Sequence, residues 1–194
     1  MTNADRVMRV ADAHRLENPE RLKWLPPDRV LALLPLRPGS VVADIGAGTG
    51  FFAIPLARAV TGEGRVFAVD LQPGMLDLLR AKLGGDAVKT ITLVSGSAQA
   101  TTLADASCDI VFIANVWHEL PDYAAALREF RRILKPGGTL AIVDWRPDVE
   151  QPPGPPLDHR IEPGVVRKTL TESRWRVQQA GLIGTYNYYA LAKP

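Results

Sequence analysis

The sequence predicts an α/β protein with a mostly parallel sheet and helices on both faces. Three observations lead to this prediction. Segments typical of strands and helices alternate between residues 41 and 145. The segment CDIVFIAN at 108–115 is apolar almost without interruption, which is typical of a strand buried on both faces. A glycine-rich turn, in VVADIGAGTGFF at 41–52, joins an apolar strand to the segment after it.

Residues 1–37 are expected to form an N-terminal helical extension. Residues 3–16 can form a short helix, with Val7, Val10, Ala11 and His14 on one face. A segment at 18–27 with three prolines follows and carries Trp24, which looks exposed. Residues 28–34 are predicted to form a second helix that ends before a pair of prolines.

Residues 38–145 are expected to form the core that binds a cofactor. Its helices have recognisable limits. The helix at 50–60 tolerates Pro55 in its first turn, where a missing N–H group costs little, and the helix at 74–83 ends at a glycine pair. A third helix occupies 122–134, and the LKPGG segment then turns the chain. Five predicted strands alternate with these helices: 41–45, 65–70, 90–96, 108–115 and 139–145.

The C-terminal part of the chain contains a proline-rich loop at 146–162 and helical and strand segments at 163–194. The loop leaves the carboxyl end of the fifth strand, so it is either part of a lid over a substrate or a plain surface loop. After a helix at 163–173, two arrangements compete. The helix either runs on to Ala180 and leaves one strand, or residues 175–183 and 186–192 pair as two strands.

Composition and charge exclude several functions. The net charge is +2 without a basic run, so nucleic-acid binding has no support. One cysteine, Cys108, excludes an internal disulfide framework and a multi-cysteine metal cluster. No stretch approaches the ~20 apolar residues of a membrane span, and the first 20 residues are too charged for a signal peptide. We therefore expect a cytoplasmic protein without stable membrane insertion.

Ligands of parallel α/β sheets bind outside the carboxyl ends of the strands. The residues predicted to lie there, along one edge of the sheet, are Asp44, Asp70, Gly96, Ser97, Asn115 and Asp144.

The glycine loop and its acidic neighbour indicate a particular kind of ligand. Glycines at 46, 48 and 50 allow positive φ angles and close approach of a ligand. Their spacing differs from the Gly-x-Gly-x-x-Gly of nicotinamide dinucleotide sites, because Phe51 stands at the third glycine position. Asp44, two residues before the loop, would repel a pyrophosphate but suits a ligand with an ammonium and a sulfonium. S-adenosylmethionine carries both groups.

Asp70 ends the second predicted strand, twenty residues after Gly50. An acidic residue at this place can accept hydrogen bonds from both ribose hydroxyls. The sequence therefore predicts a cofactor that contains a nucleoside.

The chain resembles the class I S-adenosylmethionine-dependent methyltransferases, in particular small bacterial members related to quinone-biosynthesis methyltransferases. The resemblance covers roughly residues 38–145 and rests on VVADIGAGTG, VFAVDLQPGML, GSAQ, DIVFIANVWHEL and LKPGGTLAIVDW. It implies a Rossmann-like, doubly wound, seven-stranded sheet in three α/β/α layers, with an antiparallel final strand. The family has antiparallel end strands, which favours the two-strand arrangement of the C-terminal segment.

The resemblance also implies roles for individual residues. The loop backbone at Gly46, Ala47, Gly48 and Gly50 would hold the methionine part of the cofactor, next to Asp44. Asp70 would bind the ribose, and Leu71 would pack on the adenine. Ser97 and Ala98 would lie at the adenine edge, and Asn115 would approach from the fourth strand. The family usually has an acidic residue where Ser97 stands, so adenine recognition there is expected to be weaker or to use the backbone.

His118 and Glu119 form the most suggestive pair for catalysis. His118 could accept a proton from the methyl acceptor, or the pair could simply begin a helix. Asp144 is expected to be structural rather than a base. A zinc site is not predicted, because Asp122 stands where a second histidine would be needed after the HEL sequence. An acidic acceptor would need little help from a base.

The substrate is expected to be a small molecule, because the extension and the proline-rich loop are the only material beyond the core. S-adenosylhomocysteine would be the second product. Two other classes remain open: a non-catalytic protein that binds S-adenosylmethionine or S-adenosylhomocysteine, and a nicotinamide-dependent oxidoreductase. The sequence does not predict the oligomeric state.

Overall fold

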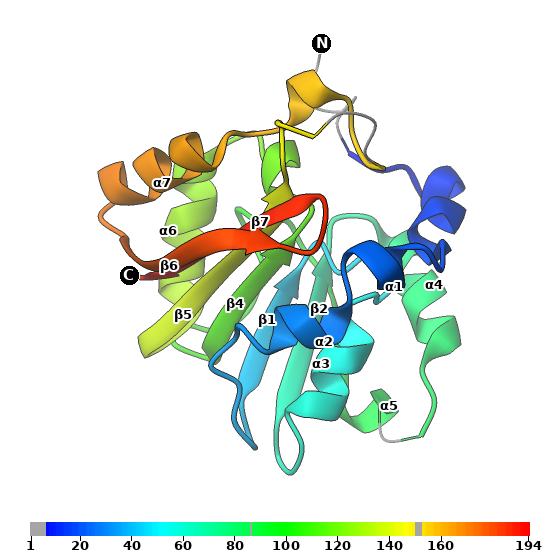
Figure 1. The fold of residues 1–194 in the computed structure, drawn as a ribbon. Helices are drawn as coiled ribbons and strands as arrows, with labels where there is room; N and C mark the ends of the chain where they lie inside the picture. The colour runs from blue at the N-terminus through cyan, green and yellow to red at the C-terminus, as the bar shows by residue number, and fades with distance from the viewer. Residues whose placement is uncertain (1–6, 86, 150–152) are drawn as a thin grey trace.

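A single seven-stranded sheet organises the chain, with strand order β3-β2-β1-β4-β5-β7-β6 (Figure 1). The computed structural model describes residues 7–85, 87–149 and 153–194. The strands are β1 Val41–Ile45, β2 Arg65–Asp70, β3 Ile91–Ser95, β4 Cys108–Ala114, β5 Leu134–Trp145, β6 Arg176–Ile183 and β7 Asn187–Lys193. The doubly wound, mostly parallel sheet predicted from the sequence is confirmed.

The C-terminal strands close the sheet in the opposite direction. β1 to β5 pair in parallel, whereas β7 lies antiparallel between β5 and β6. The prediction of two C-terminal strands is thus confirmed and the longer helix is wrong. The tight turn between the two strands contains Gly184 at a φ of 61°, a backbone conformation that favours glycine.

Helices cover both faces of the sheet (Figure 1). The α-helices are α1 Arg21–Trp24, α2 Pro27–Leu31, α3 Ala53–Ala59, α4 Pro73–Lys82, α5 Ala87–Thr90, α6 Tyr123–Ile133 and α7 Pro163–Glu172. Short 3₁₀ helices are η2 Val10–Glu17, η3 Trp117–Glu119 and η4 Leu157–His159. Apolar side chains of α6 and α7 form one core with the sheet, and those of α2, α3 and α4 form a second core on its other face.

Several predicted elements need correction. The N-terminal helix is a 3₁₀ helix over Val10–Glu17, and residues 3–6 of the predicted helix lie outside the described residues. The sequence did not predict α1 or α5. β5 begins at Leu134, so the expected LKPGG turn is the irregular start of a strand, with Gly137 at a φ of 78°. Pro55 lies in the first turn of α3, as predicted.

Candidate cofactor and substrate site

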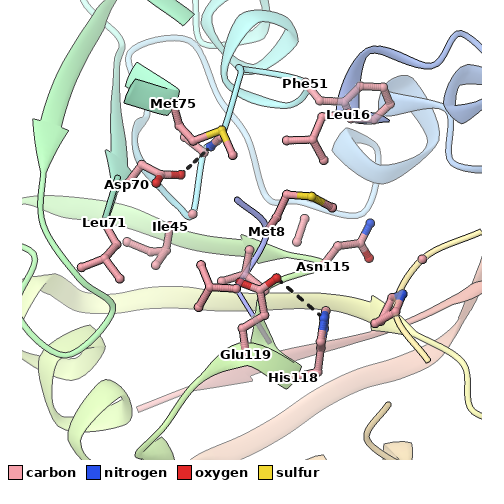
Figure 2. A pocket seen from close by; sticks show the side chains of 18 of the residues that line it. Met8, Leu16, Ile45, Phe51, Asp70, Leu71, Met75, Asn115, His118 and Glu119 are labelled. Carbon is pink, nitrogen blue, oxygen red and sulfur yellow. Dashed lines mark hydrogen bonds and ion pairs between the residues drawn. The ribbon is translucent and has the colours of Figure 1, made fainter. Parts of the chain in front are cut away.

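A large cavity lies at the carboxyl ends of β1, β2 and β4. Its volume is about 1300 Å³, larger than the roughly 300–1000 Å³ of common ligand pockets. The walls come from the glycine loop, the N-terminal extension, the segment after β4 and the proline-rich loop. Figure 2 shows side chains from the extension, from both ends of the glycine loop and from the segment after β4 around the same space. The cavity therefore has room for a cofactor and a second small molecule.

The glycine loop presents bare backbone to this cavity. Gly46 and Gly48 have φ angles of 70° and 53°, and a Cβ atom on Gly46 would lie 2.6 Å from Cγ2 of Val116. The N–H groups of Gly46 and Ala47 both donate to the carbonyl of Val69, at 2.8 and 3.0 Å. A side chain at position 46 would thus disturb both the loop and the cavity wall.

Gly50 has a different role in the loop from that of Gly46 and Gly48. It does not belong to the residues that line the cavity. Its φ is 90°, and a Cβ atom there would lie 2.3 Å from Cδ1 of Leu79 in α4. In the described structure, this glycine lets the loop pack against α4 rather than facing a ligand.

Asp70 joins the end of β2 to the glycine loop. Its Oδ2 accepts a hydrogen bond from the Gly48 N–H at 2.8 Å, and its Oδ1 accepts one from the Gln72 N–H at 2.9 Å. Burial raises the pKa of Asp70, and these two backbone hydrogen bonds oppose the shift. Each carboxylate oxygen keeps a second acceptor position, so the side chain can order the loop and still receive ligand hydroxyls.

Asp44 is the most isolated acidic group of the site. It is 2% exposed, and its Oδ2 has no hydrogen-bond partner within the described residues. Burial raises the pKa of Asp44 to about 7, and the charge of Asp70 adds to the shift. A buried carboxylate in this position gains most from a cationic ligand in the cavity.

The side predicted to hold adenine contains Leu71, Ser97 and Ala98, which all line the cavity. Leu71 is 59% exposed, so it offers a free apolar surface. The Ser97 hydroxyl oxygen accepts a hydrogen bond from the Ala100 N–H at 3.1 Å. Asn115 stands at a φ of 58°, and its Oδ1 accepts a hydrogen bond from Asn187 in β7 at 2.7 Å.

His118 and Asp144 form a buried pair next to the same cavity. His118 is 3% exposed and Asp144 is 1% exposed. The Nδ1 of His118 lies 2.8 Å from Oδ1 of Asp144, and its backbone N–H donates to Oδ2 at 2.8 Å. His118 lines the cavity and Asp144 does not.

Charges around the imidazole change its titration. Burial disfavours the charged imidazolium, but the charge and hydrogen bond of Asp144 outweigh this effect, so the pKa of His118 is raised. The Nε2 of His118 lies 3.9 Å from a carboxylate oxygen of Glu119 (Figure 2). Burial raises the pKa of Glu119 to about 7, although His118 lowers it. The pKa values of both His118 and Glu119 are therefore raised.

The proline-rich loop forms another wall. Pro153, Gly154, Pro155 and Pro156 line the cavity. The buried Arg160 folds this segment back on itself by donating to the carbonyls of Pro153, Pro155 and Arg146. Gly154 lies against the Trp145 ring so closely that a Cβ atom would be 2.8 Å from it.

The extension supplies residues that sequence reasoning missed. Gln72 donates to the Met8 carbonyl at 2.7 Å, and Met8 points into the cavity (Figure 2). Trp24 is half-buried rather than exposed, because its ring lies 5.3 Å from that of Trp145. No local signal reveals such contacts, since the partners are far apart in the sequence.

The fold and this site together define a class. A glycine loop after the first strand of a doubly wound parallel sheet, with an acid ending the second strand, is the arrangement of Rossmann-like proteins that bind nucleoside cofactors. Residues 43–142 match the family described as "Methyltransferase domain". The chain belongs to this family, and the resemblance to class I S-adenosylmethionine-dependent methyltransferases is confirmed.

Relatives with known names agree with this assignment. The chain is 34% identical over 106 residues to a demethylmenaquinone methyltransferase of Lactococcus lactis, covering 55% of this chain and 42% of that protein. It is 33% identical over 123 residues to one of Listeria welshimeri, covering 63% and 51%. The chain spans about half the length of the curated relatives it matches.

A solved structure matches almost the whole chain. The crystal structure of a SAM-dependent methyltransferase from Aquifex aeolicus superposes with a TM-score of 0.90 at 28% identity. The match covers 96% of this chain and 98% of the other. The likeness therefore includes the extension and the C-terminal strands as well as the core.

No helix in residues 7–85, 87–149 and 153–194 has the length and apolar character needed to cross a membrane. Within the same residues, no group of three or more histidine, cysteine, aspartate or glutamate side chains could hold a metal ion.

Proposed function

We propose that this chain transfers the methyl group of S-adenosylmethionine to a small-molecule acceptor by in-line displacement. The observation that carries the proposal is the single cavity that joins the glycine loop and Asp70 to His118 and the proline-rich loop. A cofactor on the first side and an acceptor on the second would meet inside one cavity. A cytoplasmic location belongs to the same proposal.

The residues of the first side fit the cofactor. The buried Asp44 carboxylate lacks a partner for its Oδ2 among the described residues, and the ammonium of the methionine part would supply one. The free acceptor positions of Asp70 suit the ribose hydroxyls. Leu71, Ser97 and Ala98 offer the adenine an apolar surface and a polar edge. Asn115 would approach from β4.

The residues of the second side favour an aromatic acceptor with an acidic hydroxyl or carbon. Trp24 and Trp145 line this part of the cavity together with Arg160, and aromatic rings prefer offset or tilted aromatic neighbours. The names of the Lactococcus and Listeria relatives, demethylmenaquinone methyltransferases, support an acceptor related to quinones. A cavity of this size suits a small molecule, and a nucleic-acid acceptor is not part of the proposal.

Bound cofactor would supply a methyl group that is already electrophilic because it is attached to a sulfonium. The protein then has to hold the acceptor in line with that methyl and keep water out. Such positioning can lower a barrier by roughly 7–11 kcal/mol at best. The described part of the proline-rich loop would act as a lid that excludes water, since residues 153–156 line the cavity and Arg160 donates to the carbonyls of Arg146 and Pro155.

His118 is the group best placed to accept a proton from the acceptor. Asp144 binds Nδ1 of the imidazole, which favours the tautomer in which Nε2 carries no proton. A base of this kind would contribute about 10²–10⁴-fold when the acceptor loses its proton in the transition state. Because the pKa of His118 is raised, this contribution increases as the pH rises.

Two experiments test the proposal. Calorimetric titration should detect binding of S-adenosylmethionine and S-adenosylhomocysteine in the micromolar range, and none of NADH. A metabolite extract incubated with methyl-labelled S-adenosylmethionine should then give a labelled product whose formation stops in the His118→Gln variant if the acceptor needs a base. Binding without any labelled product would favour a non-catalytic binding protein, and NADH binding would favour an oxidoreductase.

A further inference from the structure

Arg21 is a buried cation on the wall of the cavity. It lies in α1 of the extension, outside the family match at 43–142, and is 9% exposed. Its Nη1 donates to the Leu16 carbonyl at 2.7 Å, and its Cζ stacks 3.9 Å from the centre of the Phe51 ring. Phe51 directly follows the glycine loop and also lines the cavity. The guanidinium is therefore fixed at the far end of that loop.

The extension is tied firmly to the glycine loop. The Thr49 hydroxyl donates to the Glu17 carboxylate, and Lys82 donates both to the Thr49 carbonyl, at 2.6 Å, and to Glu17. A Cβ atom on Gly48 would touch Leu16 at 3.4 Å. These contacts place η2 beside the loop, and the contacts of Arg21 with the Leu16 carbonyl and the Phe51 ring give Arg21 a defined position there.

The guanidinium of Arg21 is stabilised by the Leu16 carbonyl, by the face of the Phe51 ring and by the charge of Glu17, but it has no ion-pair partner among the described residues. No carboxylate of residues 7–85, 87–149 or 153–194 forms an ion pair with its guanidinium, since the nearby Glu17 pairs with Lys82. Burial lowers the pKa of Arg21 to about 10, so the side chain still carries its charge at neutral pH. A buried charge without an ion-pair partner is costly, and an anion in the cavity would offset that cost.

The position of Arg21 along the cavity indicates which anion would bind to it. Figure 2 shows Asp70 and Leu71 on one side of the pocket and Phe51 and Leu16 on another. A cofactor whose ribose lies at Asp70 and whose methionine part crosses the glycine loop would end near Phe51. We propose, on the basis of the proposed function, that Arg21 binds the α-carboxylate of S-adenosylmethionine while Asp44 faces its ammonium.

The chemistry of the pair suits this role. A guanidinium offers a planar fork of donors that matches both oxygens of a carboxylate, whereas lysine offers a point charge. The zwitterionic end of the cofactor would thus be held by two buried side chains of opposite charge, one from β1 and one from the extension.

The test compares S-adenosylmethionine with its decarboxylated form, which keeps the ammonium, sulfonium and adenosine. Calorimetric titration of the wild-type chain should give at least a tenfold preference for the carboxylated ligand, in keeping with a charged hydrogen bond. Arg21→Met should abolish most of this preference by weakening only the carboxylated ligand, and Arg21→Lys should keep part of it. Arg29→Met, at an exposed arginine of the same extension that does not line the cavity, should leave the preference intact.

Each other outcome overturns the role of Arg21. If Arg21→Met kept the preference for the carboxylated ligand, another group would bind the carboxylate. An equal loss of affinity for both ligands in Arg21→Met would show that Arg21 has only a structural role. Unchanged cofactor binding with a raised KM for the acceptor would assign the arginine to the acceptor. Failure of the wild-type chain to bind either ligand would instead overturn the proposed function, and this inference with it.

Discussion

The Asp144 carboxylate holds His118 at two points, with Oδ1 2.8 Å from Nδ1 of the ring and Oδ2 2.8 Å from the backbone N–H. We predict that Asp144→Asn lowers kcat by about tenfold or more, because the ring loses the carboxylate that fixes its tautomer. The rate profile should also move to lower pH, since Asp144 is the main source of the raised pKa of His118. Steady-state kinetics between pH 5 and 9 measures both effects. A lower rate with the same pH profile would indicate a structural role.

The same pair makes stability depend on pH. The pKa of His118 is higher in the folded protein than its ordinary value of 6.5, so the folded state binds the proton more tightly. Its contribution to the free energy of unfolding is complete below about pH 6.5 and is lost as the pH rises through the folded pKa. Asp144→Asn should flatten this dependence in urea titrations. If the free energy of unfolding of the variant fell equally steeply with pH, the dependence would come from other groups.

Asp44 should release a proton when the cofactor binds. In the empty site the pKa of Asp44 is about 7, and a nearby ammonium would lower it. Titrations at pH 6.5 in buffers of different ionisation enthalpy should therefore report proton release, and Asp44→Asn should release less. Equal proton release in both proteins would contradict this role of Asp44.

The buried carboxyl group of Asp44 should lower the free energy of unfolding of the protein without cofactor. Its folded pKa exceeds the ordinary value of 3.8, so the folded state holds the proton more tightly and the free energy of unfolding falls between pH 4 and 7. The shift corresponds to roughly 4 kcal/mol at full ionisation. Asp44→Asn should thus raise the melting temperature at pH 8 while it weakens cofactor binding. A lower melting temperature would show that the carboxylate has a partner that matters more.

Asp70 should contribute both to the structure of the glycine loop and to the affinity for the cofactor. Asp70→Ala removes the acceptor of the Gly48 N–H and, in the proposed complex, that of the ribose. We predict at least a tenfold loss of S-adenosylmethionine affinity, from a lost charged hydrogen bond of about 1.5–3 kcal/mol, measured by calorimetry. Unchanged affinity would reject the ribose role.

Gly154 should matter for the acceptor and not for the cofactor. Its φ is 113°, and an alanine there would overlap the Trp145 ring. Gly154→Ala should push the proline-rich loop away from the cavity, which would raise the KM for the acceptor several-fold. Affinity for S-adenosylhomocysteine should stay within a factor of two. Equal losses for both ligands would mean that the loop also shapes the cofactor side.

The parts of the site predicted from the sequence share one property: their signal is local. Asp44 and Asp70 can be predicted because each lies near the carboxyl end of an apolar strand, and parallel strands bring these ends to one edge of the sheet. The glycine loop can be predicted because three alternating glycines follow a strand that carries Asp44 and precede Asp70. Gly50 was assigned to the ligand by the same reasoning, but its contact with Leu79 depends on how α4 packs.

The parts that were missed depend on tertiary contacts. Nothing near Arg21 in the sequence indicates that it stacks on Phe51. The pairing of His118 with Asp144 spans 26 residues and arises because β4 and β5 are neighbours in the sheet. The alternation of segments predicts that neighbourhood, but the side-chain geometry that makes Asp144 a support for His118 appears only in three dimensions.

The contact between Trp24 and Trp145 gives the molecule an optical probe of its own. Both indoles line the cavity, with ring centres 5.3 Å apart, whereas Trp117 and Trp175 are buried outside its lining. A molecule entering the acceptor side would change the surroundings of two of the four indoles and leave the other two as a steady background. Ultraviolet emission from the unlabelled chain can therefore follow acceptor binding, even before the acceptor's identity is known.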